Sequence, residues 1–325
     1  MDDPDAVVRT VLADVAPHTV GSTDSHDHLF IRTPLLAGQE LDDLARAREQ
    51  LTRFQAAGGR TVVQWTPAGL GRRLDDLRRL SLATGVQIVA ATGRHRREVY
   101  PASASISELD SEHLTDWFVR DITERRCGLV KVGTGPGSLS DDERESLLAA
   151  AHASVLTGAP IAVHLEGGAG AERVLRILGE EGVAAHKVVL GHLGRNPDLQ
   201  ELLETASSGA WLCLDSPAPS YGTTTQGLRA QVELLASEGY AGQILLGADT
   251  TTAAALATGR DAAGLLEWTR TGPHAIDVAL AQLALGANPA RAWAFKPHED
   301  AAYDERAGGV HAPDDTRRPP HAQDA

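Results

Sequence analysis

The chain has 325 residues, of which 42% are hydrophobic, and carries a formal net charge of −14. This length is large for one β-sandwich or helical bundle, and the negative charge argues against nucleic acid or an anionic membrane as a partner. The two cysteines argue against a disulfide framework and fit a reducing compartment. Because the N-terminus lacks a secretory signal and no run of about 18 apolar residues occurs, we expect a cytoplasmic protein.

Short, β-branched apolar segments alternate along the chain with segments of helical periodicity. The predicted strands are a segment ending at residue 28 and residues 60–66, 86–92, 129–132, 160–164, 187–191, 211–214 and 243–247. The predicted helices are residues 5–16, 41–57, 74–84, 105–126 with interruptions, 140–157, 169–181, a segment from 196 onward, 225–237, 273–285 and 289–295. A capping box of Ser140 and Glu143 marks one helix start, and Pro197 is expected at the first helical position of another.

Eight successive strand–helix units with apolar strands indicate a parallel sheet that closes on itself. We therefore predict an α/β protein with a (β/α)8 TIM-barrel fold that forms a single domain over residues 1–297. Residues 298–325 are rich in Asp, Arg, Pro, Ala and His and contain almost no aliphatic side chains. For this segment we expect a disordered or loosely attached tail.

Residues that can bind a metal ion recur at the C-terminal ends of five predicted strands, where the active site of such a barrel lies. They are His26, His28, Lys131, His164, His192 and Asp249. His26 and His28 are two residues apart in a strand, so their side chains point the same way and could hold one divalent ion. Any one of these histidines could instead be an ordinary buried or solvated side chain. That explanation does not account for six metal-competent residues at the same ends of five strands.

Lys131 is one of only three lysines in the chain. A protonated ammonium group beside metal ions and four imidazoles would be repelled and costly to bury. Reaction of its amine with CO₂ would give a carbamate, whose two oxygens could bridge two divalent ions. A shell of four histidines, one aspartate and one carbamate suits zinc, manganese or cobalt. The alternative is a lysine paired with Asp249 and no metal.

The sequence resembles the phosphotriesterase-related family of the amidohydrolase superfamily, many of whose members are lactonases. The resemblance covers nearly the whole predicted barrel and rests on residues 25–29, 86–93, 129–133, 163–164, 190–192, 246–249 and 288–291. It implies that His26, His28 and Asp249 hold a more buried metal ion. It further implies that His164 and His192 hold an outer ion and that carboxylated Lys131 bridges the two.

The resemblance also implies a mechanism. Two ions, most simply zinc, with manganese or cobalt as substitutes, lower the pKa of a bridging water so that hydroxide is available near neutral pH. Asp249 is the expected catalytic residue, because it is placed to take the proton of that water and pass it to the leaving group. We also expect a homodimer, since barrels of this family often form one.

Two departures from the family pattern bear on the substrate. Asp27 stands where the family usually has Glu, but it should point away from the metals. Ser216 stands where the true phosphotriesterases have His, which argues against organophosphates as main substrates. Residues 194–198 resemble the subgroup that acts on phosphorylated sugar lactones, yet the loop 250–260 is small and neutral, with Arg260 as its only basic residue.

One local feature favours an anionic substrate. Several basic residues follow the third predicted strand, at the active-site end of the barrel, and arginine forks bind carboxylate or phosphate with two hydrogen bonds. The candidate substrate-binding residues are Arg94, His95, Arg195, Ser216 and Arg260. The alternative for the basic segment is a solvated turn that pairs with nearby acidic residues such as Glu98.

We therefore predict a hydrolase that uses a bridging hydroxide on a binuclear centre to open a small ester-like bond in a small-molecule substrate. A lactone with an anionic group is the leading candidate. Hydrolysis of an amide or another C–N bond is the first alternative, and hydrolysis of a phosphotriester or phosphoester is the second. A catalytically inactive barrel that acts as a binding protein is the remaining one. The six metal-competent residues suit hydrolysis of lactones, C–N bonds and phosphoesters alike, so they do not discriminate among these three reactions.

Overall fold

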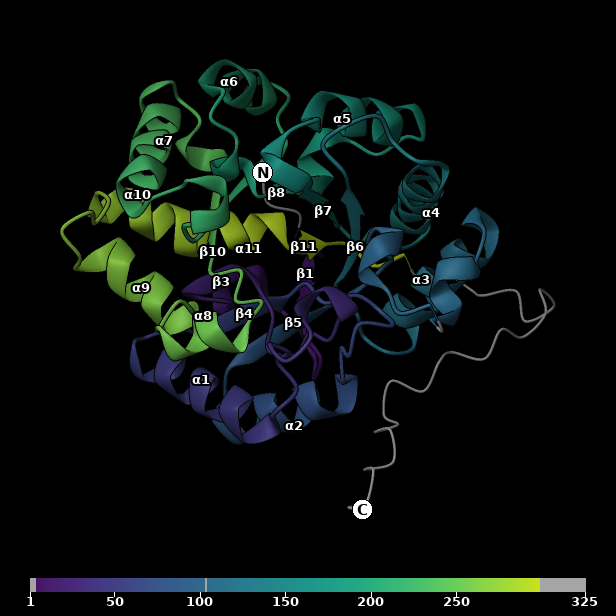
Figure 1. Ribbon diagram of the computed structural model, residues 1–325, viewed down its shortest axis with the longest axis horizontal. Helices are drawn as coiled ribbons and strands as arrows, with labels where there is room; N and C mark the ends of the chain where they lie inside the picture. The colour runs from purple at the N-terminus through teal and green to yellow at the C-terminus, as the bar shows by residue number, and fades with distance from the viewer. Residues whose placement is uncertain (1–3, 103, 299–325) are drawn as a thin grey trace.

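The computed structural model describes residues 4–102 and 104–298, and its centre is a barrel of eight parallel strands surrounded by helices (Figure 1). The strands are β3 (Thr23–Asp27), β4 (Thr61–Gln64), β5 (Gln87–Thr92), β6 (Leu129–Thr134), β7 (Ile161–Leu165), β8 (Val188–Gly191), β9 (Trp211–Asp215) and β10 (Ile244–Gly247). Each pairs with its neighbours in chain order. Where β10 meets β3, the amide of Asp249 donates to the carbonyl of His26 at 2.8 Å, so the barrel is nearly closed. The predicted (β/α)8 fold is confirmed.

The helices lie outside the barrel (Figure 1). They are α1 (Leu44–Ala56), α2 (Leu74–Thr84), α3 (Ser111–Thr123), α4 (Asp141–Thr157), α5 (Ala171–Glu180), α6 (Leu199–Ser207), α7 (Thr225–Ser237), α8 (Ala253–Ala257), α9 (Ala262–Arg270), α10 (Val278–Gln282) and α11 (Asn288–Ala292). The predicted capping box at the start of α4 is present, since the Ser140 side chain accepts from the Glu143 amide and the Glu143 side chain accepts from the Ser140 amide.

The predicted helix over residues 5–16 is wrong. This segment forms β1 (Val7–Arg9) and β2 (Asp14–Val15), which join β11 (Ala294–Phe295) in a three-stranded antiparallel sheet. Val8 pairs with Ala294, nearly the whole chain away. Because β-strand pairing depends on such distant partners, local periodicity favoured the wrong element.

Two further helix predictions need correction. The N-cap of α6 is Asp198, whose side chain accepts from the amides of Gln200 and Glu201, so Pro197 precedes the helix. The predicted helix over residues 273–285 is instead α10 followed by a π-helical turn (Leu283–Ala287), and sequence reasoning missed α9 before it. Asp261 caps α9 by accepting from the Gly264 amide at 3.0 Å, a signal that was present in the sequence.

The core has two layers. One lies between the strands and the helices, and the other fills the barrel interior with side chains such as Val63, Trp65, Val89 and Leu129. Trp293 belongs to the interior cluster, and its ring meets Trp65 edge-on at 6.2 Å. The barrel is thus a packed core rather than a channel.

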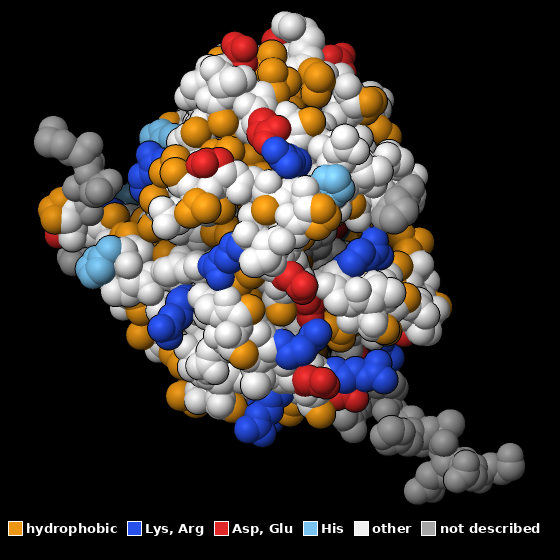
Figure 2. All heavy atoms as spheres, turned by 90° about the vertical axis from the view of Figure 1, so that its left-hand side faces the viewer, with side chains coloured by type: hydrophobic (Ala, Val, Ile, Leu, Met, Phe, Trp, Pro, Cys, Tyr) orange, Lys and Arg blue, Asp and Glu red, His pale blue; other side chains and the backbone are white. Residues whose placement is uncertain are grey.

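On the face of the molecule in Figure 2, acidic and basic side chains are interspersed rather than gathered by sign. No helix in the described part of the chain is both long and apolar enough to cross a membrane. Residues 299–325, for which a tail is predicted, lie outside the described residues.

Candidate metal centre

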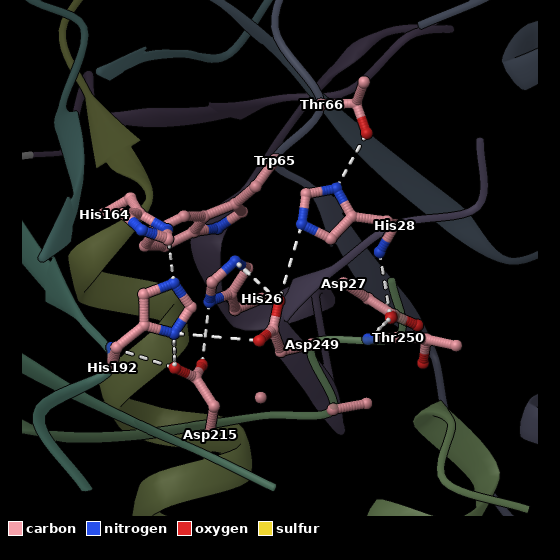
Figure 3. A network of polar contacts seen from close by, with 12 residues as sticks. His26, Asp27, His28, Trp65, Thr66, His164, His192, Asp215, Asp249 and Thr250 are labelled. Atoms are coloured by element: carbon pink, nitrogen blue, oxygen red, sulfur yellow. Dashed lines mark hydrogen bonds and ion pairs between the residues drawn. The ribbon is translucent and has the colours of Figure 1, made fainter. Parts of the chain in front are cut away.

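The six predicted metal ligands meet at the C-terminal end of the barrel. Five of them line a pocket of about 440 Å³: His28, Lys131, His164, His192 and Asp249. His26 lies beneath them and is 1% exposed. His26, Lys131 and His164 belong to β3, β6 and β7, whereas His28, His192 and Asp249 come shortly after the ends of β3, β8 and β10. Segments up to 223 residues apart in the sequence thus share one site, and Figure 3 shows its four histidines and Asp249.

The Asp249 carboxylate lies at ligand spacing from both His26 and His28. Its Oδ1 is 3.5 Å from Nε2 of His26 and 3.5 Å from Nε2 of His28. Two ligand atoms of a tetrahedral zinc ion, each bound at about 2.1 Å, are separated by roughly 3.4 Å. Each carboxylate–imidazole pair is therefore spaced as such an ion requires, and His26, His192 and Asp249 form a group whose donor atoms all lie within 4.8 Å of one another.

His164 and His192 form a second pair of donors. Nδ1 of His164 faces Nε2 of His192 at 2.6 Å, and the two rings meet edge-on with centroids 4.3 Å apart. At this distance one ring nitrogen donates a hydrogen bond to the other, and an ion between them would require the two nitrogens to separate to roughly 3.4 Å. The two histidines for which the family resemblance implies an outer ion are thus in direct contact.

The opposite nitrogen of each histidine ring contacts an oxygen atom outside the centre, and Figure 3 shows these contacts for His26, His28 and His192. These contacts join His26 Nδ1 to Asp215 Oδ1 at 2.7 Å, His28 Nδ1 to Thr66 Oγ1 at 2.7 Å, His192 Nδ1 to Asp215 Oδ2 at 2.6 Å and His164 Nε2 to Glu166 Oε2 at 3.1 Å. The His192 contact lacks hydrogen-bond geometry. The others fix the ring proton on the outer nitrogen, which leaves a lone pair facing the centre.

His28, His164 and His192 favour the neutral form that a metal ligand needs. Burial lowers the pKa of His28 to about 4 and holds the pKa of His164 well below its ordinary value. The pKa of His192 is also lowered, mainly by burial. Burial alone would raise the pKa of the Asp249 carboxyl, but the adjacent His192, His26 and Arg195 outweigh it and lower that pKa. The centre therefore combines neutral imidazoles with an ionised carboxylate.

Lys131 stands in the pocket without a carboxylate partner among the described residues. It is 1% exposed, and burial holds the pKa of its amine well below the ordinary value, with Asp249 opposing that effect. The ion pair of Asp249 is made with Arg195 instead. The alternative of a Lys131–Asp249 salt bridge is thus absent from the described structure. A neutral, buried amine is the form that reacts with CO₂.

Two of the ligands have a strained backbone. His192 and Asp249 have φ angles of 65° and 48°, in the left-handed region that non-glycine residues rarely adopt. Such strain costs on the order of 1–3 kcal/mol per residue and is characteristic of functional sites. Packing and hydrogen bonds must hold both side chains where they are, and the Asp249 amide bond to His26 is one of these restraints.

Three supporting residues were missed by sequence reasoning, which treated Asp215 only as the neighbour of Ser216. Asp215 bridges His26 and the backbone amide of His192, to which it is hydrogen-bonded at 2.8 Å. Trp65 stacks on the His26 ring at 3.7 Å, and Thr66 orients His28. The available signal was their position, since all three lie at the C-terminal ends of β4 and β9.

Four of the five predicted substrate-binding residues line the pocket, and the fifth does not. His95, Arg195, Ser216 and Arg260 line the pocket. Arg94 does not: its guanidinium is buried against α4, where it donates to Ser146 Oγ at 2.8 Å and to the carbonyls of Leu109 and Asp142. The prediction for Arg94 is therefore wrong.

Arg96 lines the pocket instead of Arg94. Asp27 points away from the metal centre, as predicted, and accepts from the Thr250 amide at 2.8 Å and from Gln50 of α1.

Residues 6–262 match the model of the phosphotriesterase family. The chain belongs to the phosphotriesterase family. This confirms the resemblance found in the sequence, and the matched region includes all six predicted metal ligands of this phosphotriesterase-family protein.

Known relatives in the family include hydrolases of different bonds. An N-acetyltaurine hydrolase of Rattus norvegicus is 30% identical over 297 residues, which cover 75% of this chain and 84% of the relative. A phospho-furanose lactonase of Mycoplasmopsis agalactiae is 29% identical over 241 residues, or 66% of this chain and 67% of the relative. The solved structure of a lactonase from Listeria monocytogenes is 27% identical, with a TM-score of 0.80 over 89% of this chain and 99% of that one. These relatives support the prediction that this phosphotriesterase-family protein is a hydrolase.

Proposed function

We propose that this protein is a metal-dependent hydrolase that opens a small lactone at a binuclear centre. The observation that carries the proposal is the convergence of His28, His164, His192, Lys131 and Asp249 on one pocket, with His26 buried next to Asp249. The outer nitrogens of His26, His28 and His164 are each hydrogen-bonded to an oxygen atom, so these donors are oriented toward the centre before any ion binds.

The donor set fits two divalent ions. His26, His28 and Asp249 would hold one ion, His164 and His192 would hold the other, and Lys131, as a carbamate, would contribute an oxygen to each. Zinc, manganese and cobalt accept this mixture of nitrogen and oxygen ligands. When bound, the pair supplies Lewis acidity and an activated water near neutral pH.

The side chains of the chain itself handle the proton and the substrate. Asp249 takes the proton of the attacking water and gives it to the alkoxide oxygen that leaves when the ring opens. Arg195 pairs with Oδ2 of Asp249, which keeps Oδ1 directed toward His26 and His28. This geometry holds the base in one orientation throughout the reaction.

The pocket suits a small substrate with an anionic group. A volume of about 440 Å³ is within the range of small-molecule sites. Its wall is apolar at Leu36, Leu70 and Val99 and carries a guanidinium group at Arg260. Among the described residues the Arg260 guanidinium has no carboxylate partner, and its one side-chain hydrogen bond goes to the Pro217 carbonyl at 3.3 Å. It is the cation most available to a substrate anion.

Amide hydrolysis is the second candidate. Its support is the relative named N-acetyltaurine hydrolase, whose matched region covers 84% of that protein. Phosphotriester hydrolysis is less favoured, because Ser216 occupies the position where true phosphotriesterases have a histidine and donates only to the Gly247 carbonyl at 3.3 Å.

The test is a direct comparison of the two reactions. Zinc-loaded protein is incubated with a panel of neutral and anionic lactones, followed by acid release, and with a panel of N-acyl amines, followed by amine release. We expect activity on lactones that is highest for anionic ones and absent from Lys131→Ala. Faster amine release would favour the second candidate. Failure of both panels, together with less than one metal ion per chain, would favour a binding protein.

A further inference from the structure

Glu166 is a pocket residue that sequence reasoning did not select. It follows β7 by one residue, in a 3₁₀ turn (Glu166–Gly168). Three side chains contact its carboxylate: His164 through Nε2 at 3.1 Å, Arg96 through a guanidinium nitrogen at 2.6 Å and Tyr221 through its hydroxyl group. Arg96 and Tyr221 come from the segments after β5 and β9 and His164 from β7 itself, so Glu166 connects three sides of the pocket.

The contact with His164 determines which of its ring nitrogens is free. A neutral imidazole carries one proton, on either Nδ1 or Nε2. Oε2 of Glu166 can only accept, so it favours the proton on Nε2. Nδ1, which faces His192 at 2.6 Å, is then left with its lone pair toward the centre. Without Glu166, the proton could move to Nδ1 and block the ligand position.

Glu166 extends a pattern that His26 and His28 already show. Asp215 accepts from the outer nitrogen of His26, and Thr66 accepts from that of His28. Thr66 and Asp215 are buried where β4 and β9 end. Glu166 lies on a loop and is 20% exposed, so its own position depends on other contacts. Arg96 and Tyr221 hold its two oxygens separately and restrict the carboxylate to one orientation.

We propose that Glu166 is a positioning residue for the outer metal ion, fixing the ring proton of His164 on Nε2 while Arg96 and Tyr221 hold its carboxylate in place. This inference rests on the proposed metal centre. Loss of a partner of this kind typically weakens metal binding about 10–100-fold. The effect should fall on the ion held by His164 and His192 and spare the ion held by His26 and His28.

The experiment is a cobalt titration of metal-free protein in bicarbonate buffer, followed by visible absorption, with thermal unfolding of each metal-free variant in parallel. Glu166→Ala removes the acceptor, and Glu166→Gln keeps the side-chain volume and one acceptor oxygen. Glu181→Ala is the matched control, since Glu181 makes a Glu–His contact of the same 3.1 Å length with His152 at the surface. Glu98→Ala removes the other carboxylate paired with Arg96 without touching His164.

We expect Glu166→Ala to bind the first ion as the wild type does and the second about 10–100-fold more weakly, with Glu166→Gln in between and both controls unchanged. Wild-type affinity for both ions in Glu166→Ala would overturn the inference. Equal weakening of both ions, or loss of the thermal transition in both Glu166 variants, would show a merely structural role and also overturn it. If the wild-type protein itself binds less than one ion per chain, the proposed function fails as well. This failure is distinguishable from failure of the Glu166 inference alone, because it is measured on the wild type and not on a variant.

Discussion

Asp215 supports one histidine of each proposed metal site, so Asp215→Asn perturbs both at once. Its Oδ1 accepts from His26 Nδ1 at 2.7 Å, and its Oδ2 accepts from the His192 amide at 2.8 Å. An asparagine has only one acceptor oxygen. If that oxygen keeps the His192 amide, the new NH₂ group faces His26 and drives its proton to Nε2, the nitrogen that should bind metal.

The expected losses of metal affinity and of unfolding free energy depend on which way the asparagine side chain is oriented. With NH₂ toward His26, the affinity for the more buried ion should fall about 10–100-fold, equivalent to about 1.4–2.7 kcal/mol at about 1.36 kcal/mol per factor of ten. With NH₂ toward the His192 amide, a buried donor loses its partner, and the metal-free protein should lose about 1–3 kcal/mol of unfolding free energy. We expect both effects, because neither orientation satisfies both donors.

The assay pairs cobalt titration with urea unfolding of the metal-free protein. Asp261→Asn is the control, since Asp261 is also a fully buried carboxylate but caps α9 away from the pocket. The asparagine keeps the N-cap, because Asn caps a helix about as well as Asp, and loses the ion pair with Arg53. This variant should bind metal as the wild type does. If Asp215→Asn shows the same profile as Asp261→Asn, the proposed orientation of His26 by Asp215 is refuted.

Four further predictions concern the lysine, the pocket and the histidines. Lys131→Ala should contain less than one metal ion per chain by elemental analysis and lose hydrolysis with it. Arg260→Ala should raise KM for an anionic lactone far more than for a neutral one, and equal effects on the two KM values would contradict its role. Arg94→Ala should lower the melting temperature and leave the ratio of the two KM values unchanged. Because the pKa of His28 is about 4 in the folded protein and about 6.5 unfolded, its neutral form stabilises the fold above pH ~6.5, and this contribution is lost as pH falls toward ~4. The difference in unfolding free energy between the metal-free wild type and metal-free His28→Gln should therefore decrease as the pH falls over this range. A difference that stays constant with pH would contradict the lowered pKa of His28. Chelation should lower the melting temperature of the wild type, since ions that bind only the folded state stabilise it, and an unchanged melting temperature would count against bound metal.

Much of the barrel could be predicted because its signals are local. Segments such as Val188–Gly191 and Ile244–Gly247 are continuously apolar, and the candidate ligands follow from where the strands end. The antiparallel sheet could not be predicted, because Val8 pairs with Ala294 at the other end of the chain. No local pattern carries that pairing.

The choice between Arg94 and Arg96 also lay beyond the sequence. Gly93, with a φ of 120°, packs so closely on β6 that an added Cβ would lie 1.9 Å from the Lys131 carbonyl oxygen. This turn directs Arg94 outward to Ser146 of α4 and leaves Arg96 in the pocket wall. The backbone conformation of one glycine thus decides which arginine can meet a substrate.

The metal content of wild-type protein, purified without chelator in the presence of zinc and bicarbonate, tests the central claim most directly. We expect two ions per chain, together with the signal of a carbamate carbon from isotope-labelled bicarbonate that is absent from Lys131→Ala. Less than one ion per chain and no carbamate signal would contradict the binuclear centre and the hydrolytic function built on it.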